Sequence, residues 1–581
     1  MKKDATSPRL LLTTVTGPYG IKSEDVDGIG MQMELLNNQI TRNQSIHSPR
    51  SNFWTFPLYF LAENLSVRTT VLDFPDWKKF VAELKNGYTH VGISFIQMNV
   101  YKVQRMARYI RRHYPGTQII LGGYGTAIPG LPDIVPCDAI CPGEGIRWLR
   151  RYFNEDPDHP IHHPVMHGVA QKTMYGVHDT IDDSAVIFPG LGCTNACFFC
   201  ATSAKFGHQY IPFLETGRDV YDVCEQLERD LSVTAFAIID ENFLKVPERA
   251  RELAALMETR QKTYTFSIFS SAEAITGLGI DFLVRMGVAL VWMGVESRKS
   301  PFAKTSRIDI AQLIKDLRAN GIAVIGSSIL FLEHHDRREI QQDIDWAISL
   351  QGDMHQFMQL VPLPGTPLYT QYKEKGLLPA DDPYKNMHGQ GKLTFLHPHF
   401  TMDEAARITG RAFRQNYRQN GPGILNMAET ALNGYNTLRQ QLETKPKPIT
   451  GSASTYIRLR LQEIKQRALT FRVALPTLFV FAPNRHIRRR AAVLAEDYKA
   501  CFGPESLRER LRARALVVIA GLEWARRKLT RLFTGHELVR QPPTRRWLYE
   551  RRTTENAGKA AAARAARLDP PAGNIVPAAK N

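Results

Sequence analysis

Six short β-rich segments, each followed by a helical pattern or a turn, occupy residues 184–400 and constrain the fold more than any other feature. Strands that alternate with helices favour a parallel sheet, because each helix carries the chain back to the edge where the next strand starts. Six such units predict a partial or complete β/α barrel, with its chemistry at the carboxyl ends of the strands. Strands are expected at residues 185–188, 235–239, 265–269, 290–293, 323–329 and 355–361, and helices at residues 219–231, 247–260, 310–320 and 337–350.

A second alternating series precedes the barrel segments. Strands are expected at residues 9–16, 67–73, 90–95 and 118–121, a helix at residues 101–113, and a last strand with a tight turn at residues 138–145. This order predicts a doubly wound α/β domain over residues 1–158. Residues 159–183 are rich in His, Pro and Asp and are interpreted as a linker to the barrel.

The chain has 581 residues and a formal charge of +17, which is distributed unevenly. From residue 451 onward lie 27 of the 74 Lys and Arg residues but 10 of the 57 Asp and Glu residues, which leaves 47 of each sign before it. The first 450 residues are therefore electrically balanced, and the charge does not indicate that the whole protein binds nucleic acid. A hydrophobic content of 43% also excludes a mostly disordered or fibrous chain.

The cysteines and the apolar segments indicate the compartment. Seven cysteines, an odd number in a long chain, do not resemble a disulfide framework. The N-terminal segment has no sustained apolar stretch of the kind that a secretory signal needs, and no segment reaches the ~18–20 apolar residues that cross a bilayer. We therefore expect a reduced, cytoplasmic protein.

Three of the cysteines, Cys193, Cys197 and Cys200, stand together directly after the first expected barrel strand. Thiolates are the natural ligands of iron–sulfur clusters, and three of them can hold three irons of a [4Fe–4S] cube while the fourth iron stays open. A structural zinc ion is normally coordinated by four ligands, and His208 is near enough in sequence to be considered as the fourth. A third interpretation is three small, buried cysteines. The spacing and the loop position favour the cluster.

The segment GCTNACFFC, with Phe199 just before its last cysteine, resembles the CxxxCxxC signature of the radical S-adenosylmethionine (SAM) superfamily. The resemblance implies that the open iron binds the methionine end of SAM. It also implies that an external flavodoxin-type or ferredoxin-type donor reduces the cluster, which then cleaves SAM to a 5′-deoxyadenosyl radical. Phe199 and segments after later strands resemble the SAM-contacting parts of the family. The resemblance implies that role for Phe199, Asp240, Glu241, Glu296 and Ser328. Each match alone is weak, because a carboxylate after a strand is usually a helix cap.

The N-terminal series resembles the cobalamin-binding subclass of this superfamily. THVGISFIQMN, IILGGYG and CDAICPGEG follow the running pattern of that subclass. The resemblance implies a cobalamin whose corrin lies between the two domains, with Ser94, Gln97, Asn99, Gly122 and Gly123 lining its cleft. The alternative is that these are ordinary turn and cap residues of an α/β domain.

One motif of the methionine-synthase-like cobalamin domains is missing. Those domains carry DxHxxG, whose histidine replaces the base beneath cobalt, whereas the loop after the first strand here reads VTGPYG. Many radical SAM members also lack this motif, so its absence is compatible with the resemblance. It leaves the lower axial ligand of cobalt open.

Residues 401–552 are expected to form a helical and increasingly basic region, and residues 553–581 a disordered tail rich in Ala, Pro and Arg. Within that region, residues 506–533 place six apolar side chains on roughly one helical face, while arginines and lysines crowd the rest. Ser506 and Glu509 have the spacing of a capping box at the start of this helix. The six apolar residues are Leu507, Leu511, Val518, Leu522, Leu529 and Phe533.

A basic amphipathic helix that carries a tryptophan is typical of an element at a membrane surface, here the inner membrane surface facing the cytoplasm. The alternative is a helical extension that packs on the barrel and keeps a solvated basic face. RNA or DNA binding is a third option, which no recognisable nucleic-acid module supports.

The leading hypothesis from these patterns is a cobalamin-dependent radical SAM methyltransferase that acts on an unactivated carbon of a small molecule, with a lipid or isoprenoid as one candidate substrate. The first alternative is an enzyme with the same cofactors that does not methylate, such as an oxidative cyclase or a rearrangement enzyme. The second is a non-catalytic adaptor in which zinc or an iron–sulfur cluster is a structural staple. No catalytic side chain is assigned from the sequence, because no motif fixes the residues that line the substrate pocket.

Overall fold

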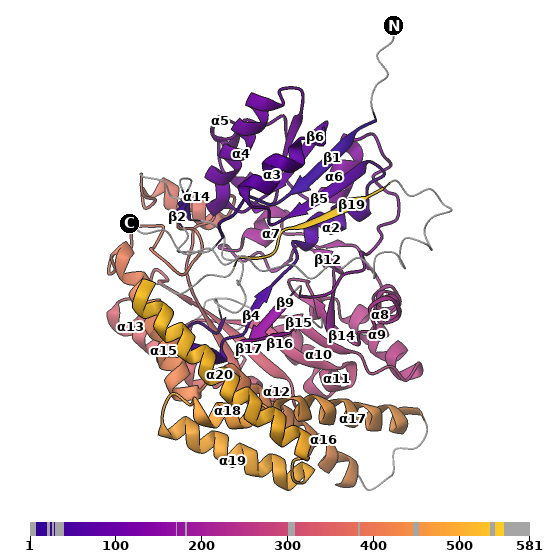
Figure 1. Ribbon diagram of the computed structural model, residues 1–581, viewed down its shortest axis with the longest axis vertical. Helices are drawn as coiled ribbons and strands as arrows, with labels where there is room; N and C mark the ends of the chain where they lie inside the picture. The colour runs from indigo at the N-terminus through magenta and orange to yellow at the C-terminus, as the bar shows by residue number, and fades with distance from the viewer. Residues whose placement is uncertain are drawn as a thin grey trace.

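The computed structural model describes residues 7–19, 24–25, 28–29, 40–169, 171–179, 183–299, 308–380, 384–444, 452–534 and 541–550. Two six-stranded sheets lie one above the other in Figure 1, and a layer of helices closes the lower end of the molecule. The fold class expected from the sequence is confirmed: an α/β domain, a partial β/α barrel and a helical C-terminal region. The expected tail, residues 553–581, lies outside the described residues.

The N-terminal sheet has the strand order β19-β5-β1-β6-β7-β8, and its strands from β5 to β8 are parallel. Its core is a cluster of buried apolar side chains such as Leu11, Val91 and Ile119, which the flanking helices cover. Strands buried on both faces read as nearly continuous apolar runs, which is why the sequence shows them clearly. The elements are β1 (Arg9–Thr13), β5 (Arg68–Asp73), β6 (His90–Ser94), β7 (Gln118–Gly122), β8 (Ala139–Ile140), α2 (Phe56–Glu63), α3 (Trp77–Leu84), α4 (Val100–His113), α5 (Leu131–Ile134) and α6 (Gly145–Tyr152).

The first strand of this sheet order comes from the far end of the chain. Strand β19 (Arg545–Tyr549) pairs antiparallel with β5, so a segment expected within a helical region is a strand. Trp547 packs with apolar residues on one face of the sheet, and Arg546 forms an ion pair with Glu83 at 2.9 Å. The strand takes its conformation from these partners rather than from its own five residues, which is why a local pattern did not indicate it.

The second sheet has the order β11-β14-β15-β16-β17-β18, with every neighbouring pair parallel and in chain order. This is the expected partial β/α barrel. The strands are β11 (Ser184–Ile187), β14 (Ala235–Ile238), β15 (Thr265–Phe269), β16 (Val288–Glu296), β17 (Ala323–Leu330) and β18 (Met354–Gln359). The helices between and after them are α8 (Gly217–Leu231), α9 (Pro247–Thr259), α10 (Ala272–Leu278), α11 (Ile280–Met286), α12 (Ile310–Ala319), α13 (Arg337–Ser349) and α14 (Pro367–Glu374).

The two domains meet through an apolar contact between α2 and the start of the barrel sheet. Phe60 of α2 lies 5.7 Å from the stacked ring of Phe188 and 5.1 Å from Phe213, measured between ring centroids. The segment interpreted as a linker contains a hairpin, β9 (Gln171–Met174) and β10 (Val177–Asp179). Strand β9 also pairs with β4 (Arg50–Asn52), so the connection between the domains is itself part of a small sheet.

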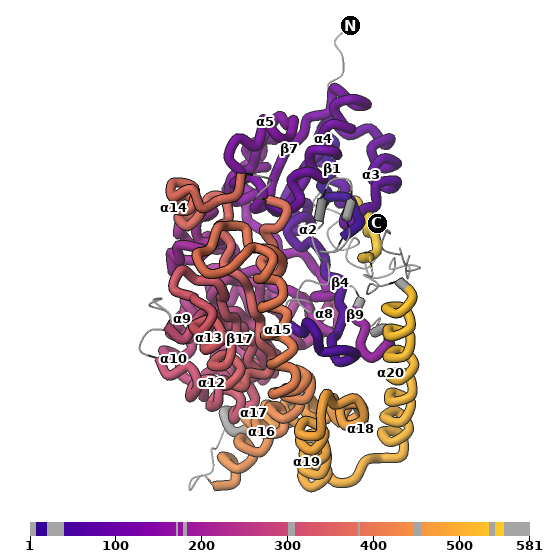
Figure 2. The backbone as a smooth tube through the Cα atoms, turned by 90° about the vertical axis from the view of Figure 1, so that its left-hand side faces the viewer, coloured from indigo at the N-terminus to yellow at the C-terminus, as the bar shows by residue number. Residues whose placement is uncertain are grey.

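The C-terminal region forms a layer of six helices that packs under the barrel and along one side of the molecule (Figure 2). Buried residues such as Leu432, Leu478 and Tyr498 form the core of this layer. Among the described helices, none combines the length and the apolar character that a membrane span requires. The helices are α15 (Met402–Asn420), α16 (Gly423–Thr444), α17 (Ser452–Arg472), α18 (Leu475–Val480), α19 (Arg485–Phe502) and α20 (Leu507–Thr534).

Candidate active site

The three cysteines lie on a closed loop at the carboxyl end of β11. Strands β12 (Gly190–Leu191) and β13 (Ile211–Pro212) pair antiparallel and tie the two ends of the loop together. Gly192 has a φ of +88°, and a Cβ at this position would lie 2.2 Å from the carbonyl oxygen of Gln209. Only glycine fits so close an approach, so the residue before Cys193 fixes the path of the loop.

Backbone contacts hold the cysteine loop in shape while the cysteines stay partly exposed. The amide of Cys200 donates to the carbonyl of Cys197 at 3.0 Å, and Cys200 is the N-cap of the short helix α7 (Ala201–Lys205). The Ser203 hydroxyl donates to the carbonyl of Cys193 at 2.7 Å. Partly exposed thiols on a fixed loop can bind a cluster that enters from the open side, whereas three buried apolar cysteines would be enclosed.

The spacing of the sulfurs distinguishes a cluster from a single zinc ion. The three cysteine sulfurs do not all lie within 4.8 Å of one another. Among the described residues, the group that meets this distance is His334, His335 and Asp343. Tetrahedral zinc with bonds of about 2.3 Å holds its sulfurs about 3.8 Å apart. His208, considered as a fourth zinc ligand, is exposed, and its Nδ1 lies 3.2 Å from Ser203 Oγ. The donor set therefore fits an iron–sulfur cluster better than zinc.

The histidine–aspartate group is a structural contact at the end of β17. His335 accepts a hydrogen bond from the Leu332 amide at Nδ1, 3.1 Å away, and its Nε2 lies 3.0 Å from Asp343 Oδ2. Both ring nitrogens are therefore engaged, and the ring keeps no lone pair for a metal. The group orients the loop between β17 and α13.

Glu241, a predicted SAM contact, lies against the cysteine loop. Its carboxylate accepts a hydrogen bond from the Gly192 amide, and burial raises its pKa to about 7. Its Oε2 is buried and has no hydrogen-bond partner within the described structure. A buried acceptor without a partner is costly, so a ligand that donates a hydrogen bond here would be stabilised. The amino group of SAM is such a donor.

Asp240, the neighbouring predicted contact, is held inside the protein. Its carboxylate pairs with Arg249 of α9 at 2.9 Å, and both side chains are about 1% exposed. The Tyr210 hydroxyl donates to the same carboxylate at 2.7 Å. Asp240 therefore joins the end of β14 to α9 and to the cysteine loop, and it can position Glu241 rather than contact a ligand itself.

Glu296 and Ser328 lie opposite each other at the carboxyl ends of β16 and β17, where the register shifts. Glu296 is buried and has a φ of +60°, which is unusual for a residue with a side chain. The Ser328 hydroxyl lies 2.9 Å from His355 Nε2, and burial lowers the pKa of His355 to about 3. Ser328 is thus engaged with a neutral histidine, while Phe199 packs beside the core of β17 and β18.

A row of aromatic and polar side chains, which was not assigned as a site from the sequence, crosses the same sheet and is partly exposed except for the buried Gln356. Phe269 stacks on Trp292 with ring centroids 5.0 Å apart, and the Trp292 indole donates to Ser327 Oγ at 2.6 Å. Ser327 in turn donates to Gln356 Oε1 at 2.8 Å. This row combines an aromatic platform with polar groups, which is the usual lining of a small-molecule site. A polar residue inside an otherwise apolar parallel strand is the signal that could have revealed it.

The predicted cobalamin residues gather at the carboxyl edge of the N-terminal sheet. Ser94 ends β6 and pairs in register with Gly122 of β7. A Cβ at Gly122 would meet no atom within 4 Å, whereas one at Gly123 would lie 2.5 Å from the carbonyl oxygen of Phe95. Gly122 therefore leaves space above the strand for a flat ligand, and Gly123 is required by the packing of two loops. Open space at a strand end fits a corrin edge.

Gln97 and Asn99 lie in the next turn, η2 (Gln97–Asn99), and both are buried. Gln97 Nε2 donates to the carbonyl of Tyr124 at 3.0 Å. The structure thus brings Ser94, Gln97, Gly122 and Gly123 to one edge of the sheet, with Gln97 supporting the loop after β7 from within.

A lysine joins the cysteine loop to this edge of the N-terminal sheet. Lys205 Nζ donates to the carbonyls of Gly123 and Pro142 and to Thr126 Oγ1, each at 3.0 Å. Burial lowers its pKa. The Tyr124 hydroxyl also lies 2.8 Å from Thr202 Oγ1 of α7. We call this set of contacts the Lys205 clamp.

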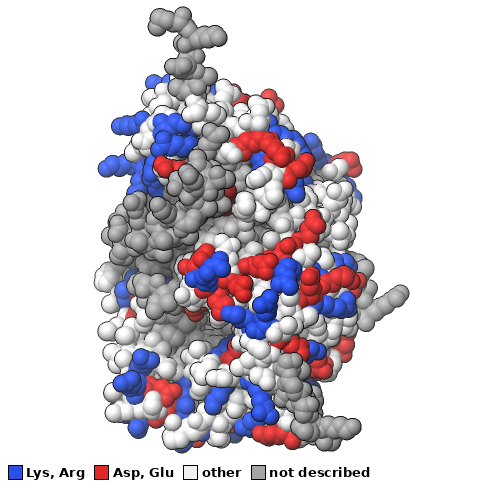
Figure 3. Space-filling model, turned by 90° about the vertical axis from the view of Figure 1, so that its right-hand side faces the viewer, with Lys and Arg blue, Asp and Glu red and all other residues white. Residues whose placement is uncertain are grey.

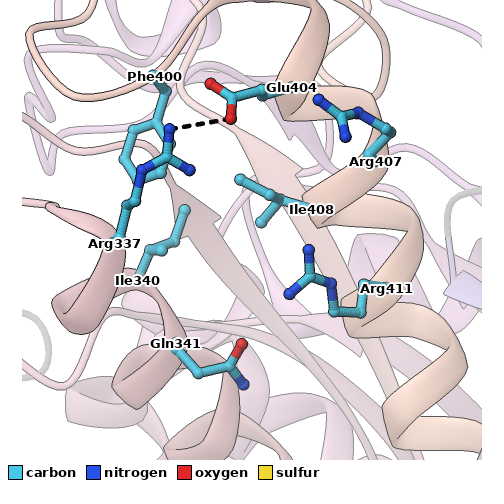
Figure 4. A pocket seen from close by; sticks show the side chains of 8 residues that line it. All are labelled: Arg337, Ile340, Gln341, Phe400, Glu404, Arg407, Ile408 and Arg411. Atoms are coloured by element: carbon cyan, nitrogen blue, oxygen red, sulfur yellow. Dashed lines mark hydrogen bonds and ion pairs between the residues drawn. The ribbon is translucent and has the colours of Figure 1, made fainter.

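A separate pocket of about 210 Å³ lies between α13 and α15, outside the barrel (Figure 4). Three arginines line it, and one of them, Arg337, forms an ion pair with Glu404 at 3.0 Å. Figure 4 marks this pair with a dashed line. Glu404 also completes a capping box with Thr401 at the start of α15. The pocket shares no residue with the cysteine loop. Its one acidic lining residue, Glu404, is engaged in capping α15.

Two curated relatives match the chain in sequence, although no family model matches it. A bacteriochlorophyllide d C-8(2)-methyltransferase from Chlorobaculum tepidum is 24% identical over 328 residues, which is 51% of this chain and 70% of that protein. An uncharacterized methyltransferase from Pyrococcus horikoshii is 22% identical over 241 residues, which is 39% of this chain and 50% of that protein. The chain thus spans about half the length of the second relative.

A solved structure supports the same fold. The radical SAM methyltransferase TsrM from Kitasatospora setae, with cobalamin and a [4Fe–4S] cluster bound, matches with a TM-score of 0.50 at 15% identity. The match covers 80% of this chain and 99% of that chain. A second structure of that protein holds tryptophan as substrate and a SAM analogue.

The architecture places a doubly wound α/β domain before a partial β/α barrel that carries the cysteine loop. The chain is similar in fold to a cobalamin-binding radical SAM methyltransferase, and in sequence to two proteins that are named methyltransferases.

Proposed function

We propose that the chain is an enzyme, a cobalamin-dependent radical SAM methyltransferase that acts on an unactivated carbon. The observation that carries the proposal is the Lys205 clamp, because it holds the cysteine loop against the glycine edge of the N-terminal sheet. One cofactor site would then face the other across a fixed distance, and methyl transfer needs such an arrangement. Both curated relatives are named methyltransferases, which supports the same reaction class.

Each group of side chains has a proposed role in this reaction. Cys193, Cys197 and Cys200 would hold a [4Fe–4S] cluster through three irons. When bound, the cluster, SAM and cobalamin would supply electron transfer, a radical source and a methyl carrier. The chain's own residues bind and orient these groups.

The proposed SAM contacts differ in what they can do. Glu241 would accept a hydrogen bond from the amino group of SAM at its buried Oε2. Asp240 would position Glu241 through the Arg249 pair, and Glu296 would approach SAM from the neighbouring strands. Ser328 and Phe199 would shape the wall behind these carboxylates.

The cobalamin cleft would be lined by Ser94 and Gly122 and supported by Gln97, Asn99 and Gly123. Phe269 and Trp292 would exclude water from the space between the cofactors, since their stacked rings are partly exposed on the barrel sheet. Ser327 and Gln356 would orient a polar group of the substrate. We propose a small molecule or an isoprenoid lipid as substrate, and a flavodoxin or ferredoxin as electron donor.

Anaerobic reconstitution with iron, sulfide and hydroxocobalamin tests the proposal. The reduced protein should show a [4Fe–4S] spectrum and, with SAM and a cell extract as substrate source, release both 5′-deoxyadenosine and S-adenosylhomocysteine. Deoxyadenosine without S-adenosylhomocysteine during turnover would favour a non-methylating enzyme with the same cofactors. A protein that assembles no cluster would refute the enzyme assignment. Comparing metabolites and lipids of a deletion strain for the loss of one methyl group would identify the substrate.

A further inference from the structure

Helix α20 turns its large apolar side chains away from the protein. Leu522 is 68% exposed and Phe533 is 81% exposed, whereas Ala513 and Ala520, on the opposite side, are 7% and 0% exposed. Figure 2 shows α20 standing along one side of the molecule, apart from the barrel. A helix packed only for stability would bury leucines and expose alanines.

The exposed apolar residues form a straight stripe. Leu507, Val518 and Leu529 recur every 11 residues, and so do Leu511, Leu522 and Phe533. An 11-residue repeat corresponds to about 3.67 residues per turn, so it stays nearly parallel to the axis of a straight helix with 3.6 residues per turn. A heptad repeat, in contrast, winds around the helix and suits a second coiled helix. The stripe of α20 therefore matches a flat apolar surface.

The rotation of α20 about its axis is fixed by contacts on its inner side. Ala520 packs with Ile46, Tyr175 and Ala474, and Leu516 lies beside them. Glu523 accepts hydrogen bonds from Arg526 and Arg527 at 2.7 Å each, and Arg527 also donates to the Ser45 carbonyl at 3.0 Å. These contacts keep the stripe on the outer side.

The charges on the exposed side are basic. On a helical projection Arg508 and Arg526 flank one side of the stripe, while Arg510, Arg514 and Lys528 flank the other. The helix has two acidic residues, Glu509 and Glu523, and each is engaged in contacts within the protein. Trp524 is 43% exposed, with the Lys528 ammonium 5.5 Å from its ring centroid. Apolar residues rimmed by cations and an aromatic ring complement the surface of an anionic bilayer.

We propose that α20 docks the protein on an anionic lipid bilayer, with the stripe lying in the headgroup region and the flanking arginines and lysine on lipid phosphates. This inference goes beyond the proposed reaction and does not depend on it. Because α20 is anchored to η1 (Ser45–His47) and to α18, the whole body would be held at one orientation to the membrane.

Vesicle flotation of the full-length protein tests the docking surface. The probes are vesicles of phosphatidylcholine alone and of phosphatidylcholine with 30% phosphatidylglycerol. We expect flotation with the anionic vesicles, weaker flotation with the neutral ones, and a decrease at high salt because ions screen the attraction.

The key variant is Leu511→Asp/Leu522→Asp, since both side chains are more than half exposed and their replacement leaves the core intact. Replacing two leucines that would lie in the apolar phase by charged residues should lower the partition coefficient at least about tenfold. The matched control is Val493→Asp on α19, which is 54% exposed and lies outside the stripe. This control should bind like the unaltered protein.

Three results would overturn the proposal. One is an unaltered protein that stays in the soluble fraction with both kinds of vesicle. Another is a Leu511→Asp/Leu522→Asp protein that floats as well as the Val493→Asp protein. The third is a dimer, seen by light scattering without lipid and dissociated by the double substitution, because the stripe would then bind a second copy of this chain.

Discussion

Helices α8 and α20 are both long and amphipathic, and both begin with a capping box. They differ in that α8 turns its apolar side toward the protein and α20 turns it away. In α8 the capping box is Thr216 with Asp219, and in α20 it is Ser506 with Glu509. Helix α8 buries Val220 and Leu227 against the barrel strands, whereas α20 leaves five of its six leucines exposed. The comparison shows that an amphipathic pattern alone does not determine which side of a helix faces the protein.

The two regions also differ in how their charges are arranged. On the face of the molecule that carries α8 and α9, basic and acidic side chains alternate (Figure 3). Arg249 of α9 is buried and paired with Asp240, while Arg514 of α20 is exposed. In the barrel this buried charge stabilises the protein interior, whereas exposed arginines of α20 such as Arg514 are available to a partner.

Loss of a single cysteine should give the largest difference between the barrel and α20, because it should abolish cluster binding and leave vesicle binding unchanged. Cys197→Ala removes one of the three proposed thiolate ligands, so the iron content should fall to background and deoxyadenosine release should be undetectable. The flotation of this variant with anionic vesicles should not change. The matched control is Cys501→Ala, a half-buried cysteine of α19 that lies outside the loop, which should keep the cluster. Normal iron in the Cys197→Ala protein would contradict the assignment.

Two arginine substitutions should separate buried from exposed charge. Arg249→Met leaves Asp240 buried and unpaired, so the free energy of unfolding should fall by about 3–5 kcal/mol. Arg514→Met should change it by less than about 0.5 kcal/mol, because the side chain is exposed. Urea unfolding followed by tryptophan fluorescence measures both. Equal shifts in the urea midpoints of the two variants would show that the buried and the exposed arginine contribute equally to stability, which would contradict the prediction.

Acid should loosen the junction that carries α20. Burial lowers the pKa of His47 to about 4, so between pH 6.5 and 4 the folded state binds fewer protons than the unfolded state. Its contribution to stability is therefore present at pH 7 and declines as the pH falls, by up to about 2 kcal/mol between pH 7 and pH 5.

Comparing His47→Gln with the unaltered protein isolates the contribution of His47 to the pH dependence of stability, because the other buried histidines remain in both. The variant should lose less stability between pH 7 and pH 5, measured by thermal unfolding at each pH. An unchanged pH dependence would contradict the assignment to His47.

Removing the two helix caps should give the smallest effects. Thr216→Ala should lower the free energy of unfolding by about 1 kcal/mol, because α8 is part of the barrel core. Ser506→Ala should instead raise hydrogen exchange in the first turn of α20 by roughly fivefold, with little change in global stability. Global destabilisation by Ser506→Ala would show that α20 is a cooperative part of the body.

The barrel strands could be predicted from the sequence because they are buried on both faces. Strand β15 covers the residues that its apolar run indicates, Thr265–Phe269. Strand β16 extends further than expected, to Glu296, because a glycine and a carboxylate at its end do not read as strand. Strand β19 and the pairing of β9 with β4 depend on partners far along the chain, so no local pattern reveals them.

The cysteine loop could be predicted because its spacing lies within eight residues. The row from Phe269 to Gln356 could not, since each member resembles core or turn when its strand is read alone. The Lys205 clamp is also invisible to local reading, because its three acceptors lie 63 to 82 residues earlier. The roles proposed for the SAM and cobalamin residues stay predictions.

Strand β19 has a consequence for how the protein is made. Its partner β5 is synthesised first, and Arg545 can pair with Asp73 only after the roughly 470 residues between them have been added. At 5–20 residues per second the edge of β5 stays open for roughly half a minute to a minute and a half. During this time an unpaired strand edge is exposed to other nascent chains. The N-terminal domain thus becomes complete last, after the barrel it precedes.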